Sequence, residues 1–259
     1  MSLNRELQQL SQALEGELHY DELHKNIYAT DASVYRKIPL AVAYPKGHDD
    51  LKELISFATQ NKVSLVPRTA GTSLAGQCVG EGIIVDTSKY FTRILAFDER
   101  NKTVRVEPGV VRDELNEFLK PFGLFFGPNT STSNRCMMGG MVGNNSSGTT
   151  SIQYGITRDK VLEMNTILSD GSASFFGPLS ASAFKEKLKG NSVESKIYNL
   201  LFHELSKEEV REEIKREFPK PNIHRRNNGY AIDAILSNEL FSESKAPINL
   251  SKLLCGSEG

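Results

Sequence analysis

The chain has 259 residues, of which 39% are hydrophobic and 24% are charged, and its formal net charge is −1. These values are typical of a globular protein with one large domain or two lobes, each able to bury a sizeable core. The small net charge gives no electrostatic argument for a nucleic-acid partner or an anionic membrane. No apolar run reaches the ~18 residues that a membrane-spanning helix needs.

The first 90 residues alternate between helical and strand patterns. Leucines at positions 3, 7, 10 and 14 predict a helix over residues 4–15. Strands are predicted over Leu40–Tyr44, Val63–Val66 and Gly82–Asp86, the last of them buried on both faces. A helix with Asp49 or Asp50 as its N-cap separates the first two strands. This order predicts a βαβ-like first lobe.

A different pattern begins near residue 93 and predicts an α+β second lobe. Arg93–Phe97 and Thr103–Val106 form one predicted hairpin, and Val110–Leu119 is a predicted helix. A second hairpin joins Val161–Leu168 to Ser172–Phe176 through an Asp-Gly turn. Residues 182–217 are rich in Lys, Glu and Leu and predict surface helices.

A first glycine-rich segment directly follows the second predicted strand. It reads Pro67-Arg68-Thr69-Ala70-Gly71-Thr72-Ser73-Leu74-Ala75-Gly76-Gln77. Successive backbone N–H groups in such a loop form an anion-binding concavity, and its hydroxyl groups suit the oxygens of a pyrophosphate. The segment matches neither a P-loop nor a Rossmann fingerprint. A plain connecting loop is the alternative interpretation.

A second glycine-rich segment covers residues 127–148 and is followed by Tyr154-Gly155. Long loops without secondary structure are usually functional or disordered, and the four apolar residues within this one argue against disorder. We predict a short helix over Met138–Asn145, whose glycines allow a flat ring or a pyrophosphate to approach the backbone. A glycine-rich helix packed on a neighbour is the alternative. A ligand between the two lobes would use both segments.

The cysteine and histidine patterns predict no metal site. Cys78, Cys136 and Cys255 lack metal-ligand spacing, so we expect three free thiols in a reducing, cytoplasmic compartment. None of the five histidines has a partner at ligand spacing, and we expect surface or local structural roles for His19, His24, His48, His203 and His224. The pairs Asp21-Glu22 and Asp49-Asp50 are interpreted as helix-entry acids.

Three segments, in order along residues 40–259, resemble one superfamily. Pro67–Gly76 resembles the pyrophosphate loop of the FAD-linked oxidases of the vanillyl-alcohol-oxidase/PCMH superfamily. Met138–Gly148 with Tyr154-Gly155 resembles their second flavin-contacting segment, and Asn228-Gly229-Tyr230 with Gly256-Ser257-Glu258-Gly259 resembles a third. The branch that these segments resemble contains D-lactate dehydrogenase, glycolate oxidase and D-2-hydroxyglutarate dehydrogenase.

This resemblance implies an α+β, two-lobed PCMH-type FAD-binding domain with FAD between the lobes. The expected parts are an N-terminal helical extension over residues 1–37, a first lobe over 38–90 and a second lobe over 91–259. The implied reaction is oxidation of a D-2-hydroxy acid (D-lactate, glycolate or D-2-hydroxyglutarate) by hydride transfer to flavin N5, with an electron acceptor that the sequence does not identify. No catalytic residue is assigned.

The resemblance also implies which residues bind FAD. In the first segment they are Pro67, Arg68, Thr69, Ala70, Gly71, Thr72, Ser73, Gly76 and Gln77. In the second they are Pro128, Thr130, Met138, Gly139, Gly140, Gly143, Asn144, Ser147, Gly148, Tyr154 and Gly155. For a substrate carboxylate, the guanidinium groups of His224-Arg225-Arg226, of Arg135 or of Arg158 are candidates. A solvated basic turn is the alternative for residues 224–226.

Two departures from the superfamily pattern refine this expectation. Thr72 stands where some members carry a flavin-linked His, and Gly127 stands where others carry a flavin-linked Cys, so we expect non-covalent FAD. In the family, Gly-Ser-Glu-Gly continues into Thr-Leu-Gly and a C-terminal cap domain that faces the substrate. We therefore expect this chain to be part of a longer protein, inactive without its cap domain, and cytoplasmic or peripheral to the inner face of the membrane. An FAD- and NADPH-dependent enolpyruvyl-sugar reductase on the same fold is the alternative.

Overall fold

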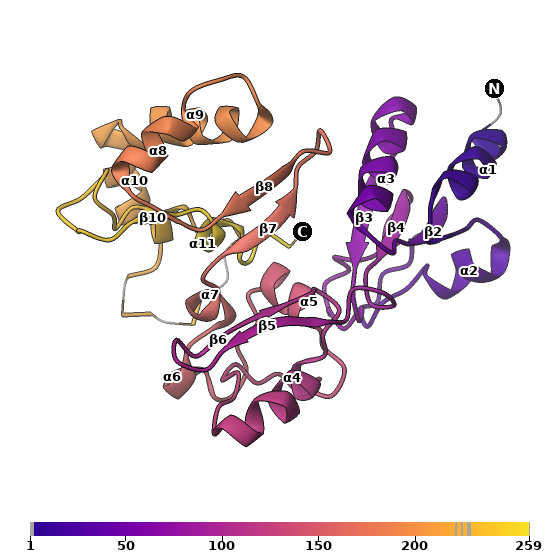
Figure 1. The fold of residues 1–259 in the computed structure, drawn as a ribbon, viewed down its shortest axis with the longest axis horizontal. Helices are drawn as coiled ribbons and strands as arrows, with labels where there is room; N and C mark the ends of the chain where they lie inside the picture. Colours follow the sequence, from indigo (N-terminus) through magenta and orange to yellow (C-terminus); the bar gives the residue numbers. More distant parts are fainter. Residues whose placement is uncertain (1–2, 221, 224, 227–228, 259) are drawn as a thin grey trace. The chain divides into compact units, whose positions relative to one another are not determined.

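The computed structural model describes residues 3–220, 222–223, 225–226 and 229–258 (Figure 1). The chain divides into two compact units, one ending at Met141 and the other comprising Val142–Glu258. Each unit has its own hydrophobic core clusters. The predicted mixture of helices and strands is thereby confirmed, while the predicted boundaries after residues 37 and 90 stay predictions.

A four-stranded sheet with the order β1-β2-β4-β3 forms the centre of the first unit. Strands β2 (Ala41–Tyr44), β4 (Ile83–Asp86) and β3 (Leu65–Arg68) are parallel, and β1 (Glu17–His19) pairs antiparallel with β2. All four residues of the central strand β4 are buried, as predicted. Helices α1 (Leu3–Ala13) and α3 (His48–Asn61) contribute leucines and Phe57 to the same core.

Strand β3 extends beyond its predicted end and includes Pro67 and Arg68. Proline lacks an N–H donor and is tolerated in a strand only where one side remains unpaired. This condition is met because β3 lies at the edge of the sheet, where β4 is its one partner strand among the residues that the structure describes. The strand therefore delivers Arg68 directly to the first glycine-rich loop.

Residues 3–37 hold the predicted helix α1 and also elements that the sequence did not reveal. They supply β1 to the sheet and form the short helix α2 (Glu22–Ile27), for which Asp21 is the N-cap.

The expectation that Asp49 or Asp50 caps α3 was wrong, because Gly47 occupies that position. The buried carboxylate of Asp50 instead accepts backbone N–H groups from Glu15 at 2.8 Å, Gly16 at 2.9 Å and Lys46 at 2.8 Å.

The remainder of the first unit surrounds a second core. The predicted hairpin is confirmed as β5 (Ile94–Asp98) and β6 (Thr103–Val106). Helix α4 (Arg112–Leu119) begins two residues later than predicted because Val111 forms an isolated bridge with Met137. After the 3-10 turn η1 (Lys120–Phe122), the chain reaches helix α5 (Met138–Gly143). Leu115, Leu119 and Met141 are buried together in this core.

The second unit consists of two small antiparallel strand pairs and several helices. The predicted hairpin is confirmed as β7 (Met164–Ile167) and β8 (Ala173–Phe176), and β9 (Pro178–Leu179) pairs with β10 (Ile248–Asn249). Helices α8 (Ala181–Lys187), α9 (Val193–Leu205) and α10 (Glu208–Glu217) form the predicted helical region. They also bury Phe184, Tyr198, Leu205 and Ile214, so they are core elements as well as surface helices. The shorter helical elements are α6 (Ser151–Tyr154), α7 (Thr157–Lys160), η2 (Ile232–Ile235) and α11 (Ser251–Leu254).

Across the part of the chain that the structure describes, no helix combines the length and apolar character needed to cross a membrane. Cys78, Cys136 and Cys255 are all free and buried.

Candidate functional site

The first glycine-rich loop leaves strand β3 at Arg68 and is fixed by contacts to residues 28–35. The Arg68 guanidinium donates to the carbonyl of Thr30 at 2.9 Å and lies over the Tyr28 ring at 4.9 Å. The Gly71 carbonyl accepts the N–H of Ala32 at 3.1 Å. Arg68 is therefore occupied mainly in holding the loop in place.

Two glycines give this loop its shape. Gly71 and Gly76 have φ angles of +62° and +77°, a region that side chains with a Cβ rarely adopt. A Cβ at Gly71 would also lie 2.7 Å from an Arg68 nitrogen. Among the described residues, the backbone N–H groups of Gly71, Thr72 and Ser73 have no hydrogen-bond acceptor. The loop thus presents donors that suit an anionic group.

Helix α5 meets this loop inside the first unit. The N–H groups of Met138 and Gly139 donate to the carbonyls of Val110 at 2.9 Å and Pro108 at 2.8 Å, which fixes the start of the helix. A Cβ at Gly140 would lie 2.6 Å from the Thr69 Oγ1 atom of the loop. The structure therefore brings together two predicted segments that are far apart in sequence.

The second glycine-rich segment continues into the second unit, where three stretches of chain are joined. Asn145, with a φ of +49°, accepts the Arg158 N–H on its side-chain oxygen at 2.9 Å. The Ser146 carbonyl accepts the N–H and the hydroxyl of Thr157 at 3.0 and 2.6 Å. The N–H groups of Gly256 and Glu258 donate to the carbonyls of Val142 and Gly143 at 3.0 and 2.9 Å. The second and third predicted segments are thus in direct contact.

A cavity of about 320 Å³ opens beside this junction. Its lining residues are amide, hydroxyl and guanidinium groups with one apolar side chain, namely Asn144, Asn145, Ser146, Ser147, Ile156, Arg225 and Arg226. Hydrogen-bond donors predominate in such a lining, which suits an anion or a polar ligand.

The four predicted anion-binding arginines differ in their exposure to solvent. Arg158 is buried, and its Nε and Nη2 atoms donate to the carbonyl of Cys255, whereas its Nη1 atom has no partner among the described residues. Burial lowers the pKa of Arg158. Arg226 is half-buried and pairs with Asp233, while Arg225 is exposed. Arg135 is exposed as well and donates to Asn134 at 3.0 Å.

The other predicted residues lie in supporting positions. The Pro128 carbonyl accepts Arg112 Nε at 3.2 Å, and the Thr130 hydroxyl lies 3.2 Å from the Cys136 sulfur. Gly148 and Gly155 have φ angles of +91° and +77°, and Gly155 directly follows Tyr154, the last residue of α6. The predicted His224 and Asn228, together with Gly259, lie outside the described residues.

The expectation that no histidine has a partner at ligand spacing was wrong for His19 and His24. His19 Nε2 lies 3.0 Å from a Glu17 oxygen, and His24 Nδ1 lies 2.8 Å from Asp21 Oδ2. The signal in the sequence is the run Glu17-x-His19-x-Asp21-x-x-His24, in which every second residue of β1 points to one face before α2 begins.

Comparison with known proteins agrees with this geometry. Residues 39–175, more than half of the chain, match the family described as FAD binding domain. The chain is 36% identical over 234 residues to D-2-hydroxyglutarate dehydrogenase from Escherichia coli, which covers 89% of this chain and 22% of that protein. It is 34% identical over 254 residues to the Haemophilus influenzae protein of the same name, covering 96% of this chain and 24% of that protein. The chain therefore spans about a quarter of the length of these relatives.

Solved structures show the same fold at low sequence identity. The BBE-like 1 protein of Physcomitrella patens gives a TM-score of 0.58 at 18% identity, covering 65% of this chain and 37% of that one. The 6-hydroxy-D-nicotine oxidase of Arthrobacter nicotinovorans gives a TM-score of 0.55 at 19% identity, covering 62% of this chain and 36% of that one. The chain therefore belongs to the FAD binding domain family and has the α+β fold of the PCMH-type FAD-linked oxidases.

Proposed function

We propose that this chain is the FAD-binding part of a flavin-dependent dehydrogenase that oxidises a D-2-hydroxy acid. The observation that carries the proposal is the match to proteins named D-2-hydroxyglutarate dehydrogenase, which extends over 89% to 96% of this chain. A shorter match, 34% identical over 147 residues, links it to the glycolate oxidase subunit GlcD of Bacillus subtilis. D-2-Hydroxyglutarate, glycolate and D-lactate are accordingly the substrates to test.

The first loop and helix α5 would hold the cofactor in the first unit. The open N–H groups of Gly71, Thr72 and Ser73 fit a pyrophosphate, and the hydroxyls of Thr69 and Thr72 add further donors. Gly140 allows helix α5 to pack closely on this loop, because a Cβ there would meet Thr69. When bound, FAD supplies the two-electron acceptor for the hydride of a hydroxy acid.

The second unit carries its own set of polar groups that suit a ligand. Gly143, Asn144, Ser147 and Gly148 lie on the segment whose side chains line the 320 Å³ cavity or flank it. The guanidinium of Arg225, which lines this cavity, is suited to orient an anionic group there. The other residues assigned to FAD in the sequence remain predictions.

Flavin retention by purified variants tests this assignment. Gly71→Val adds a side chain where φ is +62°, and Gly140→Val adds one against Thr69, so both variants should lose FAD and its visible absorbance. Gly47→Val is the matched control, because a Cβ at Gly47 meets nothing within 4 Å and the backbone there is extended. Unchanged flavin content in both test variants would refute the placement, provided that circular dichroism shows all three folded.

Acid precipitation tests the proposed non-covalent attachment. Because Thr72 and Gly127 cannot form the histidyl or cysteinyl bond, the flavin should remain in the supernatant. Yellow colour that stays with the precipitated protein would contradict this.

Substrate-dependent bleaching of the flavin tests the reaction class. We expect one of the three hydroxy acids to bleach the flavin of the protein purified from its own source, and NADPH to leave it oxidised. Bleaching by NADPH alone would favour a reductase instead.

Because all three cysteines are free and buried, we also propose a cytoplasmic location, which cell fractionation can check.

A further inference from the structure

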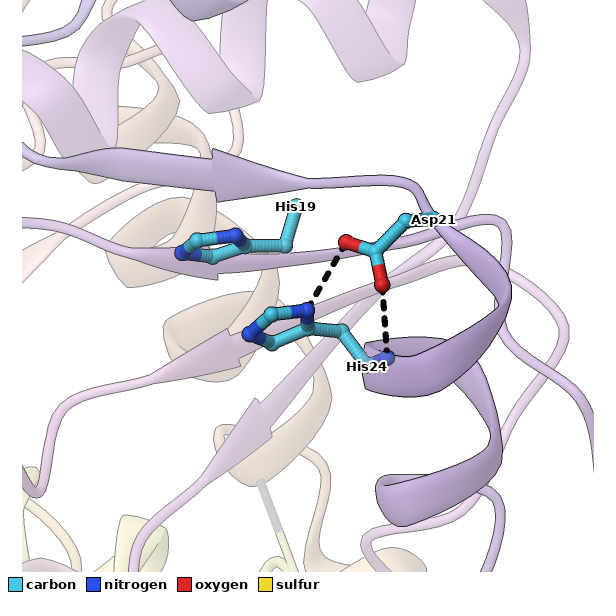
Figure 2. Close-up of side chains that lie close together, drawn as sticks. All are labelled: His19, Asp21 and His24. Atoms are coloured by element: carbon cyan, nitrogen blue, oxygen red, sulfur yellow. Dashed lines mark hydrogen bonds and ion pairs between the residues drawn. The ribbon is translucent and has the colours of Figure 1, made fainter.

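Three potential metal ligands meet where strand β1 ends and helix α2 begins (Figure 2). His19 is the last residue of β1, Asp21 is the N-cap of α2 and His24 is the third residue of α2. The two imidazole rings are stacked with centroids 3.9 Å apart and an angle of 13° between their planes. One ligand atom from each of the three side chains lies within 4.8 Å of the other two.

Each imidazole already has a carboxylate partner. Asp21 Oδ2 lies 2.8 Å from His24 Nδ1, and its other oxygen accepts the backbone N–H of His24 at 3.1 Å. Glu17 lies 3.0 Å from His19 Nε2, which leaves the Nδ1 atom of His19 available to another partner. The carboxylates of Asp21 and Glu17 therefore place negative charge beside the two imidazole rings.

Glu17 is itself held firmly in place by hydrogen bonds. Lys89 donates to it at 2.5 Å and the hydroxyl of Tyr90 donates to the same oxygen. A carboxylate that fixes the far nitrogen of a histidine is the arrangement found behind most metal-ligating histidines.

We propose that His19, Asp21 and His24 form a binding site for a divalent transition-metal ion of the zinc class. Imidazole nitrogen and carboxylate oxygen are the ligands that such ions accept. Bonds of about 2.0–2.2 Å place tetrahedral ligand atoms roughly 3.3–3.6 Å apart, so the cluster must contract by at most about 1.5 Å. The side chains are free to do so, because 29% of His19, 29% of His24 and 53% of Asp21 is exposed.

The bound ion would join β1 to α2 across the short connection that contains Asp21. Since the three ligands leave one side open to solvent, water completes the coordination sphere. The site uses no residue that we assign to FAD, so it stands or falls independently of the proposed oxidoreductase activity.

Metal titration of the chain tests the site directly. After chelator treatment and removal of any polyhistidine tag, Zn²⁺ is titrated by calorimetry and Co²⁺ by its visible absorption. We expect one equivalent to bind, and at least about tenfold weaker binding in His19→Gln, His24→Gln and Asp21→Asn. Asp21→Asn keeps an oxygen for capping α2, so it separates loss of the ligand charge from loss of the helix start.

His203→Gln is the matched control, because the exposed ring of His203 lies on helix α9 and pairs at 3.7 Å with Glu204. This variant should bind Zn²⁺ as the parent chain does. Absence of saturable binding, or unchanged affinity in the double variant His19→Gln/His24→Gln, would overturn the proposal. Should a variant fail to fold, Zn²⁺ must still perturb the imidazole NMR signals of His19 and His24 in the parent chain before those of His48 and His203.

Discussion

Replacement of Asp50 by Asn should destabilise the first unit markedly, although the two side chains have nearly the same size. Asp50 Oδ1 accepts the N–H of Glu15, and Oδ2 accepts those of Gly16 and Lys46, all between 2.8 and 2.9 Å. The residue is 5% exposed, so water cannot easily take over these contacts. One carboxylate therefore ties the connection between α1 and β1, and the segment after β2, to helix α3.

The magnitude follows from the geometry. An amide has one oxygen, so in either orientation its NH₂ group faces at least one of the three N–H donors. A buried donor without an acceptor costs about 1–3 kcal/mol, and loss of the charge weakens the contacts that remain. We expect a loss of about 2 kcal/mol, or a melting temperature lower by about 4–8 °C for a domain of this size.

Thermal unfolding followed by circular dichroism measures the effect, with Asp49→Asn as the control. The Asp49 side chain is 96% exposed and its ion pair with Lys52 lies at the surface, so its loss should change stability by less than about 0.5 kcal/mol. Equal melting temperatures for the two variants would refute the reasoning, because both make the same chemical change at adjacent positions.

Two further predictions concern the carboxylate of Glu17 and the hydroxyl of Tyr198. Hydrogen bonds from Lys89, Tyr90 and His19 lower the pKa of Glu17 to about 2. The ionised Glu17 carboxylate therefore stabilises the fold fully above the pKa of about 4.3 that it has in the unfolded chain. This stabilisation is lost as the pH falls toward 2. The melting temperature of Glu17→Gln should therefore lie below that of the parent at pH 7 and approach it as the pH falls from about 4.3 toward 2, whereas a constant difference would contradict this linkage. Tyr198 is fully buried and its hydroxyl has no partner among the described residues, so Tyr198→Phe should be neutral or stabilising by up to about 1 kcal/mol in urea unfolding. A destabilisation above that value would mean that the hydroxyl is satisfied in solution.

Local patterns predicted most of the fold correctly. The run Ile83-Ile84-Val85 identified the central buried strand, and the Asp-Gly turn identified the hairpin of β7 and β8. Strand β1 was missed because three residues give no recognisable alternation, and its place in the sheet depends on pairing with β2. The role of Asp50 was missed because its three donors come from two separate segments that precede it, at residues 15–16 and at Lys46, and only the tertiary fold brings them together.

The sequence predicted which segments form the candidate site, but it did not predict the contacts between them. Glycine clustering and the resemblance to FAD-linked oxidases identified the stretches later matched by the family over residues 39–175. Neither indicated that Gly140 would face Thr69, or that Gly256 and Glu258 would bond to Val142 and Gly143. Such contacts depend on the tertiary fold, and so does the meeting of His19 with His24.

The close approach of Gly140 to Thr69 has an evolutionary consequence. With a Cβ at position 140 only 2.6 Å from Thr69 Oγ1, the volumes available to the two positions are not independent. A lineage that acquires a larger residue at 140 must lose the hydroxyl at 69 or shift its rotamer. Positions 69 and 140 are thus expected to diverge as a correlated pair, although 70 residues of chain separate them.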